Sequence, residues 1–290
     1  MNDDWIVTAY VVIDEVMQAL GHRSHALART SDAAVLTVAV VAAKYFQNHH
    51  ERALGVLRLG GYLSGPLSAS RLNRRLHALA EWLGLALATL GELLATGAVF
   101  LLDSMPVPVC KRARAGRCRK VRGREFCGYC AAKRERFCGW RLHLVCTATG
   151  VPVAFDLLPG ALHDLTPVHE LVYGLPAGAA IYADKAYNAG DDEASILAET
   201  GARLVPLHRA NMRPNDRADK LALRAHRRRI ETLYSQLAAM GVQRLHARTN
   251  DGLERKLLAS LLAVAFSNAN EQSRLLYLVM LVNVYVRQVG

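Results

Sequence analysis

An ordered alternation of short apolar runs and helical segments, between Ala98 and Met240, is the strongest constraint on the fold of this chain. Short apolar or alternating runs predict strands, and Thr149-Gly150 predicts the turn of a hairpin. An antiparallel start followed by alternating strands and helices predicts an α/β domain, with a mixed sheet and helices on its faces. The predicted strands cover 98–102, 140–147, 151–158, 179–183 and 202–207, and the predicted helices cover 165–173, 191–199 and 219–240.

The first third of the chain predicts helices only. The pair Ser31-Asp32 has the form of an N-cap before the apolar, helix-periodic segment 33–46. The pattern changes near Ala98, so we expect separate domains on either side of it. The predicted organisation is an all-α N-terminal domain over 1–97, an α/β domain over 98–270 with a basic insert at 110–138, and a helical tail over 271–290.

A helix predicted over 71–82, capped by Ser68 or Ser70, carries three arginines on one face. Residues three and four apart on a helix are neighbours, which places Arg71, Arg74 and Arg75 together. This face suits the recognition helix of a helix-turn-helix. A solvated arginine face is an equally good interpretation.

Positive charge is concentrated after Gly97. The 290 residues include 36 Lys and Arg and 25 Asp and Glu, a net charge of +11, whereas the first 97 residues carry eight of each sign. Lys111–Arg136 has eleven basic residues and two acidic ones, and Arg203–Arg229 has nine and two. Such local fields suit a polyanion, with nucleic acid as the leading candidate. A solvated basic surface is the plainer interpretation.

Several classes of protein are excluded by what the chain lacks. Its apolar runs fall short of the roughly 18 residues that a membrane span needs. The first residues carry Asp3 and Asp4 in place of the basic start of a secretory signal. We therefore expect a cytoplasmic protein whose six cysteines stay reduced, without a disulfide framework. The Gly-x-Gly-x-x-Gly and Walker patterns are absent, which argues against a nucleotide cofactor.

Two aspartates directly follow predicted strands. Asp103 and Asp184 stand at carboxyl ends of strands, where α/β sheets place their ligand sites, so the two carboxylates meet if the strands are neighbours. Glu231 flanks the apolar stripe of the helix predicted over 219–240 and could be aimed at both. The ordinary alternatives are turn aspartates and a surface pair between Glu231 and Arg227.

Three carboxylates in one small space repel one another, and divalent cations remove that repulsion. Oxygen-rich carboxylate sites favour hard ions such as Mg²⁺ or Mn²⁺. Two such ions about 4 Å apart can activate a water or a 3′-hydroxyl in phosphodiester displacement. A basic protein with an acidic metal site is therefore suited to cutting or joining nucleic acid.

At these residues the sequence resembles the DDE transposases of bacterial insertion sequences, most closely the family numbered nine-eight-two and, more distantly, the transposases like those of family four. The resemblance implies an RNase H-like domain with a mixed five-stranded sheet, in which Asp103, Asp184 and Glu231 are the catalytic triad and hold two Mg²⁺ or Mn²⁺ ions. It also implies cleavage at terminal inverted repeats, strand transfer to target DNA, and a homodimer on double-stranded DNA in the bacterial cytoplasm, at the nucleoid. The segments that carry it are 102–110, 139–144, 182–188 and 228–232, with 71–75 in the N-terminal domain.

The resemblance has limits within the last predicted helix. Arg227 stands one turn before Glu231, where related transposases have an arginine. Arg224 replaces a tyrosine of those relatives and Ala238 replaces a lysine, so the roles of that tyrosine and lysine are not carried over.

Further DNA contacts are expected from side chains that flank the acids or lie in the basic insert. For His143 a satisfied sheet histidine is the more common role, and Asp164 is expected to be a helix N-cap. The predicted DNA contacts are Lys185, Tyr187, Arg227, Arg228, Arg141, His143, Arg119, Lys120 and Arg122, together with Arg71, Arg74 and Arg75 of the first domain.

The basic insert contains cysteines that could bind zinc. Cys127 and Cys130 have the separation of a zinc knuckle, and Cys110 and Cys118 would complete a set of four. Zinc would organise a segment with little core of its own. Against this, Cys110 and Cys118 lack knuckle spacing. Cys138 and Cys146 are interpreted as ordinary strand cysteines.

Two other functions remain open from the sequence. One is a nuclease of the same fold that cleaves DNA without strand transfer. The other is a non-catalytic nucleic-acid-binding protein built around a zinc-containing basic module. The second predicts metal-dependent DNA binding without cleavage.

Overall fold

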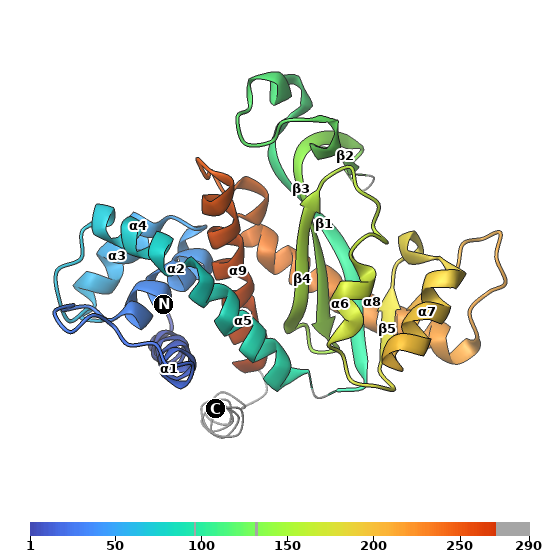
Figure 1. Cartoon of the computed structure of the whole chain (residues 1–290), viewed down its shortest axis with the longest axis horizontal. Coiled ribbons are helices and arrows are strands. Elements are labelled where there is room, and N and C mark those ends of the chain that lie inside the picture. The colour runs from blue at the N-terminus through green and yellow to red at the C-terminus, as the bar shows by residue number, and fades with distance from the viewer. Residues whose placement is uncertain (96, 131–132, 271–290) are drawn as a thin grey trace. The chain divides into compact units, whose positions relative to one another are not determined.

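A computed structural model describes residues 1–95, 97–130 and 133–270 (Figure 1). The chain forms two compact units. Within the described residues, the first consists of Met1–Leu93 and 236–270, and the second of Leu94–Ser235. Residues 236–270 thus belong to the helical unit, whereas the sequence predicts that the α/β domain continues to residue 270. The tail predicted over 271–290 lies outside the described residues.

The first unit is built from helices, as the sequence predicts. In α2, the hydroxyl of Ser31 accepts the N–H of Ala34 at 3.1 Å and caps the helix. In α9, which includes Asn268, the side chain of Asn268 exchanges hydrogen bonds with that of Gln236. The helices of this unit are α1 (Asp3–Ala19), α2 (Asp32–Phe46), α3 (His50–Leu59), α4 (Ala69–Ala78), α5 (Ala80–Leu94) and α9 (Asn250–Asn270).

The helix predicted over 71–82 is two helices in the structure. α4 ends at Ala78, Leu79 is buried between the two, and α5 begins at Ala80. Ser68 is the N-cap, with its hydroxyl accepting the N–H of Arg71 at 3.3 Å.

The second unit is a mixed sheet with helices on its faces. Its strand order is β4-β3-β1-β5-β6, with β3 antiparallel to β1 and β4, and β5 parallel to β1 and β6. Gly150 takes a positive φ of 83° in the turn between β3 and β4, which glycine allows without strain. The strands are β1 (Val99–Lys111), β2 (Cys127–Cys130), β3 (Glu135–Thr147), β4 (Pro152–Pro159), β5 (Ala180–Ala183) and β6 (Arg203–Pro206), and the helices are α6 (Val168–Tyr173), α7 (Gly190–Thr200) and α8 (Arg217–Ala239).

The sheet has six strands, one more than the predicted five. The additional strand, β2, lies in the basic insert and pairs antiparallel with Glu135–Cys138 of β3. The sequence does not predict it because the insert has little apolar periodicity. The backbone hydrogen bonds to β3 can hold such a four-residue edge strand without an apolar pattern.

Strand β1 is also longer than predicted. The sequence predicts its end at Leu102 because Pro106 and Pro108 follow, but the strand continues through both prolines to Lys111. Among the described residues, β5 pairs with β1 only over Val99–Leu102. One edge of β1 is therefore unpaired beyond that point, and an unpaired edge tolerates residues without an N–H.

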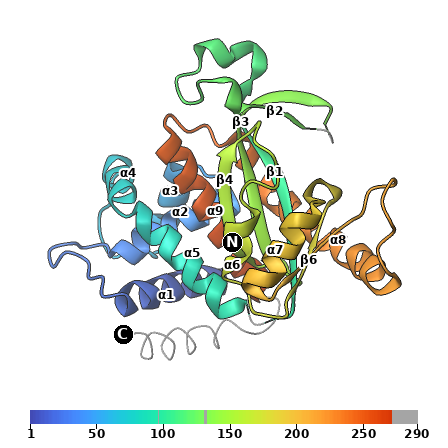
Figure 2. The same cartoon turned by 45° about the vertical axis from the view of Figure 1, so that its right-hand side comes forward.

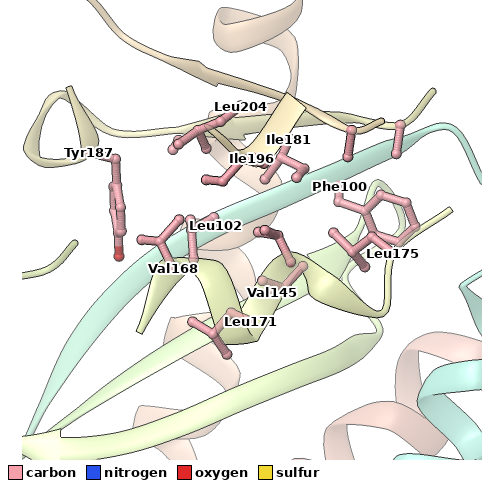
Figure 3. Close-up of a cluster of buried hydrophobic side chains, with 14 residues drawn as sticks. Phe100, Leu102, Val145, Val168, Leu171, Leu175, Ile181, Tyr187, Ile196 and Leu204 are labelled. Atoms are coloured by element: carbon pink, nitrogen blue, oxygen red, sulfur yellow. The ribbon is translucent and has the colours of Figure 1, made fainter. Parts of the chain in front are cut away.

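A buried apolar cluster lies between the sheet and two helices (Figure 3). Phe100 and Leu102 of β1, with Ile181 of β5, face Val168 and Leu171 of α6. Ile196 of α7 packs in the same cluster. Because side chains alternate along a strand, the intervening residues of β1 and β5 point to the opposite face, which α8 lines. Figure 2 shows α6 and α7 in front of the sheet.

In the part of the chain that the structure describes, no helix is both long enough and apolar enough to span a membrane.

Removing Phe100 tests this core. Its side chain is fully buried, so we expect Phe100→Ala to lower the free energy of unfolding by about 3–5 kcal/mol. Urea unfolding followed by circular dichroism measures the change. Leu221→Ala is the matched control, since Leu221 is 58% exposed on α8 and should unfold almost like wild type. Equal losses in the two variants would contradict the assigned core.

Candidate active site

The pairing of β1 with β5 places two aspartates side by side. Leu102 of β1 and Ala183 of β5 form the last register pair between these parallel strands. Asp184 directly follows the end of β5, whereas Asp103 is the next residue within β1, which continues to Lys111. Each carboxylate accepts the backbone N–H of the residue after it, Ser104 or Lys185, at 2.7 Å. The predicted convergence of the two aspartates is therefore present in the sheet.

Helix α8 brings the third acid to the same place. Asp103, Asp184 and Glu231 all line one cavity of about 350 Å³, between the α8 side of the sheet and the helix. Cations from α8 line it as well. They are Lys220, Arg224 and Arg227. The cavity thus combines three carboxylates with three cationic side chains.

The carboxylate of Glu231 pairs with an arginine of the same helix. Its Oε1 accepts the Nε–H of Arg227 at 2.9 Å, and the two side chains are 57% and 68% exposed. The surface-pair interpretation of Glu231 is therefore realised. Across the described residues, no three His, Cys, Asp or Glu side chains converge as a ready metal-binding group. An exposed pair at this spacing is worth only about 0.3–0.5 kcal/mol, so Glu231 can exchange Arg227 for another partner at little cost.

Asp103 is the most perturbed acid of the site. Burial raises its pKa to about 7, and the neighbouring carboxylates of Asp184 and Asp164 add to the rise. The N–H of Ser104 and the guanidinium of Arg227 oppose it. A cation bound between these carboxylates would relieve the repulsion.

Two tyrosines with buried hydroxyls lie near Asp103. Burial raises the pKa of Tyr187 and of Tyr234 well above the ordinary value, and the carboxylate of Asp103 raises both further. Both phenols therefore stay neutral. The DNA contact predicted for Tyr187 is wrong, because this side chain is fully buried in the apolar cluster (Figure 3).

Asp164 is a fourth acid, and the role that the sequence predicts for it is wrong. α6 begins at Val168 after Pro167, so Asp164 is not the N-cap of that helix. Its Oδ1 instead accepts the hydroxyl of Ser104 at 2.8 Å and lies 3.7 Å from Nη1 of Arg141. Ser104 directly follows Asp103, so this contact ties Asp164 to the strand that carries the first catalytic candidate.

The DNA contact predicted for His143 is wrong. The side chain is completely buried, and neither ring nitrogen has a hydrogen-bond partner among the described residues. Burial lowers the pKa of His143 to about 4, against the opposing effect of Asp164. Nδ1 lies 3.9 Å from Oδ1 of Asp164, which is beyond hydrogen-bond distance, so the satisfied-histidine interpretation is not realised by direct contacts among the described residues. Arg141 is 17% exposed and donates to Ser104 and to the carbonyl of Tyr129.

The arginine face of α4 is divided between two roles. Arg75 donates from Nε and Nη2 to Asp32 at 3.2 and 2.5 Å, so it serves the helical unit. Arg71 and Arg74 are exposed. All three line a hollow of about 730 Å³ in the first unit, in which Asp32 is the sole carboxylate among the described residues of the lining. This hollow suits phosphate groups better than a metal ion.

The other predicted DNA contacts lie at the surface of the second unit. Lys185 follows Asp184 directly and is exposed, and Arg228 is exposed on α8. In the insert, Arg119 and Arg122 are exposed and Lys120 is half-buried.

The bonding and arrangement of the cysteines differ from those that the sequence predicts. Cys127 is bonded to Cys138, although the sequence predicts no disulfide and an ordinary strand role for Cys138. Cys127 and Cys130 are the two ends of β2, not a metal-binding turn. Residues three apart on a strand point to opposite faces, so these two cannot share an ion there.

Sequence reasoning missed Lys220 and Arg224 as cavity-lining residues. The signal was present, since positions 220, 224, 227 and 231 are spaced four, three and four apart and share one face of a helix. Asp164 had no comparable signal, because its contact with Ser104 depends on a loop between β4 and α6.

The comparisons with known proteins agree with this geometry. A family model described as transposase DDE domain matches residues 94–251, more than half of the chain. The chain belongs to this family, and its second unit has the RNase H-like arrangement of a mixed sheet with flanking helices. The match does not assign it to family nine-eight-two. Searches of curated proteins and of solved structures give no match.

The raised pKa of Asp103 predicts stability that falls as pH rises. The unfolded chain loses this proton near 3.8 and the folded chain near 7. Between these values the folded state binds the extra proton, so the free energy of unfolding decreases with increasing pH. We expect Asp103→Asn to lose this decline and to melt above wild type at pH 8 in metal-free buffer. Thermal melts of both proteins across this pH range measure it, and identical slopes would contradict the pKa.

Proposed function

We propose that the chain is a DNA transposase that cleaves phosphodiester bonds at the ends of a bacterial insertion sequence and joins the freed 3′-hydroxyl to target DNA. The observation that carries this proposal is the single cavity lined by Asp103, Asp184 and Glu231, from β1, β5 and α8. Its substrate would be double-stranded DNA of the terminal inverted repeats and of the target, in the bacterial cytoplasm.

The donor set of the cavity fits divalent Mg²⁺ or Mn²⁺. All three acids supply hard oxygen ligands. The pKa of Asp103 is raised first by burial and further by the carboxylates of Asp184 and Asp164, and a cation would relieve the repulsion from these two neighbours. We assign Asp103, Asp184 and Glu231 as the residues that would hold two ions. When bound, such ions would activate the attacking hydroxyl or water and stabilise the leaving oxygen.

Arg227 connects phosphate binding with the position of Glu231. It pairs with Glu231 and lies close enough to Asp184 and Asp103 for both carboxylates to raise its pKa. A DNA phosphate offers the guanidinium a bidentate partner. Arg227 would then exchange Glu231 for the phosphate and leave the glutamate free to turn into the cavity. Lys220 and Arg224 would hold neighbouring phosphates along the same helix face.

The helical unit would grip the DNA outside the reacting bonds. Arg71 and Arg74 are exposed on α4, beside a hollow whose lining is rich in arginine. Transposition handles two DNA ends together, so we propose a homodimer on DNA. The exposed Lys185, Arg228, Arg119 and Arg122 would add phosphate contacts from the second unit.

A nuclease of the same fold without strand transfer is the second candidate. Both activities need the same carboxylates, so they differ in the product. Joined DNA molecules appear only with a transposase. Membership of the transposase family favours strand transfer over simple hydrolysis, and it argues against a purely DNA-binding protein.

Neutral variants of the triad test the proposed chemistry. Asp103→Asn, Asp184→Asn and Glu231→Gln keep the side-chain shapes and remove the charges that would hold the ions. We expect each to reduce Mg²⁺-dependent cleavage and joining of labelled inverted-repeat DNA to the level of a metal-free reaction. DNA binding, measured by fluorescence anisotropy in the same buffer, should persist.

Asp191→Asn is the matched control. Asp191 is an exposed acid in the first turn of α7, outside the cavity, and its loss should leave both reactions at wild-type rates. A triad variant that cuts as fast as wild type would remove that residue from the proposed site. Cleavage without any joined product would favour the nuclease.

The three arginines of α4 should separate binding from stability. Arg71→Ala and Arg74→Ala should each weaken DNA binding and reduce the slope of log affinity against log salt by about 1 for each phosphate that is no longer neutralised. Arg75→Ala should chiefly lower the free energy of unfolding, by about 1–3 kcal/mol, because Asp32 loses a charged donor. Salt titrations and urea melts measure the two effects. An Arg75→Ala protein with normal stability and weak binding would reverse this division.

A further inference from the structure

Four cysteines from separate parts of the chain lie at the base of the basic insert as two pairs, which the described residues do not join into a ready metal-binding group. Cys110 in β1 is the cross-strand partner of Cys138 in β3, and Cys138 is also the cross-strand partner of Cys127 in β2. Cross-strand partners in an antiparallel ladder carry their side chains on the same face. The sulfurs of Cys127 and Cys138 are bonded, and their Cα atoms are 4.3 Å apart.

Cys118 completes the group from the insert itself. Its thiol is hydrogen-bonded to that of Cys110, and the backbone N–H groups of Lys120 and Val121 also donate to its sulfur. When the backbone N–H groups of the second and third residues after a cysteine donate to its sulfur, they stabilise the thiolate and orient it as a ligand. The backbone around Cys118 therefore orients its sulfur as a metal ligand would be oriented. A cysteine with only a packing role would not need these hydrogen bonds.

The segment 112–126 between β1 and β2 has little else to hold it together. Its regular structure is two short 3₁₀ turns, and within this fully described segment Val121 is the one buried apolar residue. It carries seven Arg and Lys residues against Glu125. A small segment with so little core usually needs a disulfide or a metal to fold.

We propose that Cys110, Cys118, Cys127 and Cys138 form a four-thiolate zinc site that closes the insert. Four thiols bind one Zn²⁺ and release four protons, which leaves a centre of net charge −2 among the cations of the insert. In the described structure the sulfurs stand as two pairs, so the zinc form requires the Cys127–Cys138 bond to be open. Two molecules of a small thiol reduce this bond and leave as one disulfide.

This site differs from the set that the sequence suggests. Cys138 replaces Cys130, which lies at the other end of β2 from Cys127 and points to the opposite face. Cys146 is fully buried, further along β3. These two cysteines are therefore matched controls for the four ligands.

Metal analysis of the full chain tests the proposal. The protein is purified with a phosphine reductant and Zn²⁺, freed of unbound metal by gel filtration, and analysed for zinc. We expect one zinc per chain. Replacing zinc by Co²⁺ should give the intense visible absorption and thiolate charge-transfer bands of a tetrahedral four-sulfur site. Carboxylate ligands such as those of the triad cannot produce these bands.

Single substitutions separate the two sets of cysteines. Cys118→Ser and Cys138→Ser should lose the zinc and the cobalt bands, whereas Cys130→Ser and Cys146→Ser should keep both. For wild type, a thiol-modifying reagent should release the zinc as four thiols react, which tests the site without any variant that misfolds. A wild-type chain without zinc, cobalt bands without thiolate charge transfer, or zinc that depends on Cys130 and not on Cys138 would overturn the proposal.

Discussion

Parallel pairing of β1 with β5 creates the active-site candidate from residues that are far apart in the chain. The four register pairs from Val99–Ala180 to Leu102–Ala183 bring two carboxylates together just beyond the paired segment. The pairing is fixed by Phe100, Leu102 and Ile181, which are buried against α6 and α7. A slip of one residue would turn these side chains to the wrong face. The apolar core therefore sets the position of the acids, although it contains none of them.

Electrostatics at this site disfavours three ionised carboxylates side by side. Asp103 is partly protonated near neutral pH because it is buried beside Asp184 and Asp164. Glu231 is neutralised separately, by Arg227 on its own helix. The resting protein thus avoids the repulsion of a formed triad. In the proposed reaction, DNA phosphates would compete for Arg227 and metal ions would compete for Glu231.

Periodic patterns in the sequence predict most of the fold, and the failures have local causes. The hairpin, β5, β6, α7 and α8 follow from apolar runs bounded by Gly and Pro, and Asp184 follows from its place at a strand end. Asp103 follows from its place after an apolar run, although β1 continues past it and does not end there as predicted. The predicted β1 is too short because proline usually ends a strand, whereas a strand paired on one side accepts it. β2 has no apolar signal, and its existence depends on the neighbouring β3. The burial of His143 and Tyr187 depends on whether each side chain faces the core or the solvent. A single sequence does not predict this orientation.

The paired length of β1 and β3 gives the protein a fixed spacer. The ladder runs on past Asp103 to Cys110 and Lys111, and Figures 1 and 2 show the insert projecting beyond the ends of both strands. At about 3.3 Å per residue, the seven residues from Asp103 to Cys110 span roughly 23 Å. A duplex aligned with β1 would meet the insert about seven base pairs from the reacting bond, given a rise of about 3.4 Å per base pair. The ladder therefore holds the cationic insert at a fixed distance from Asp103.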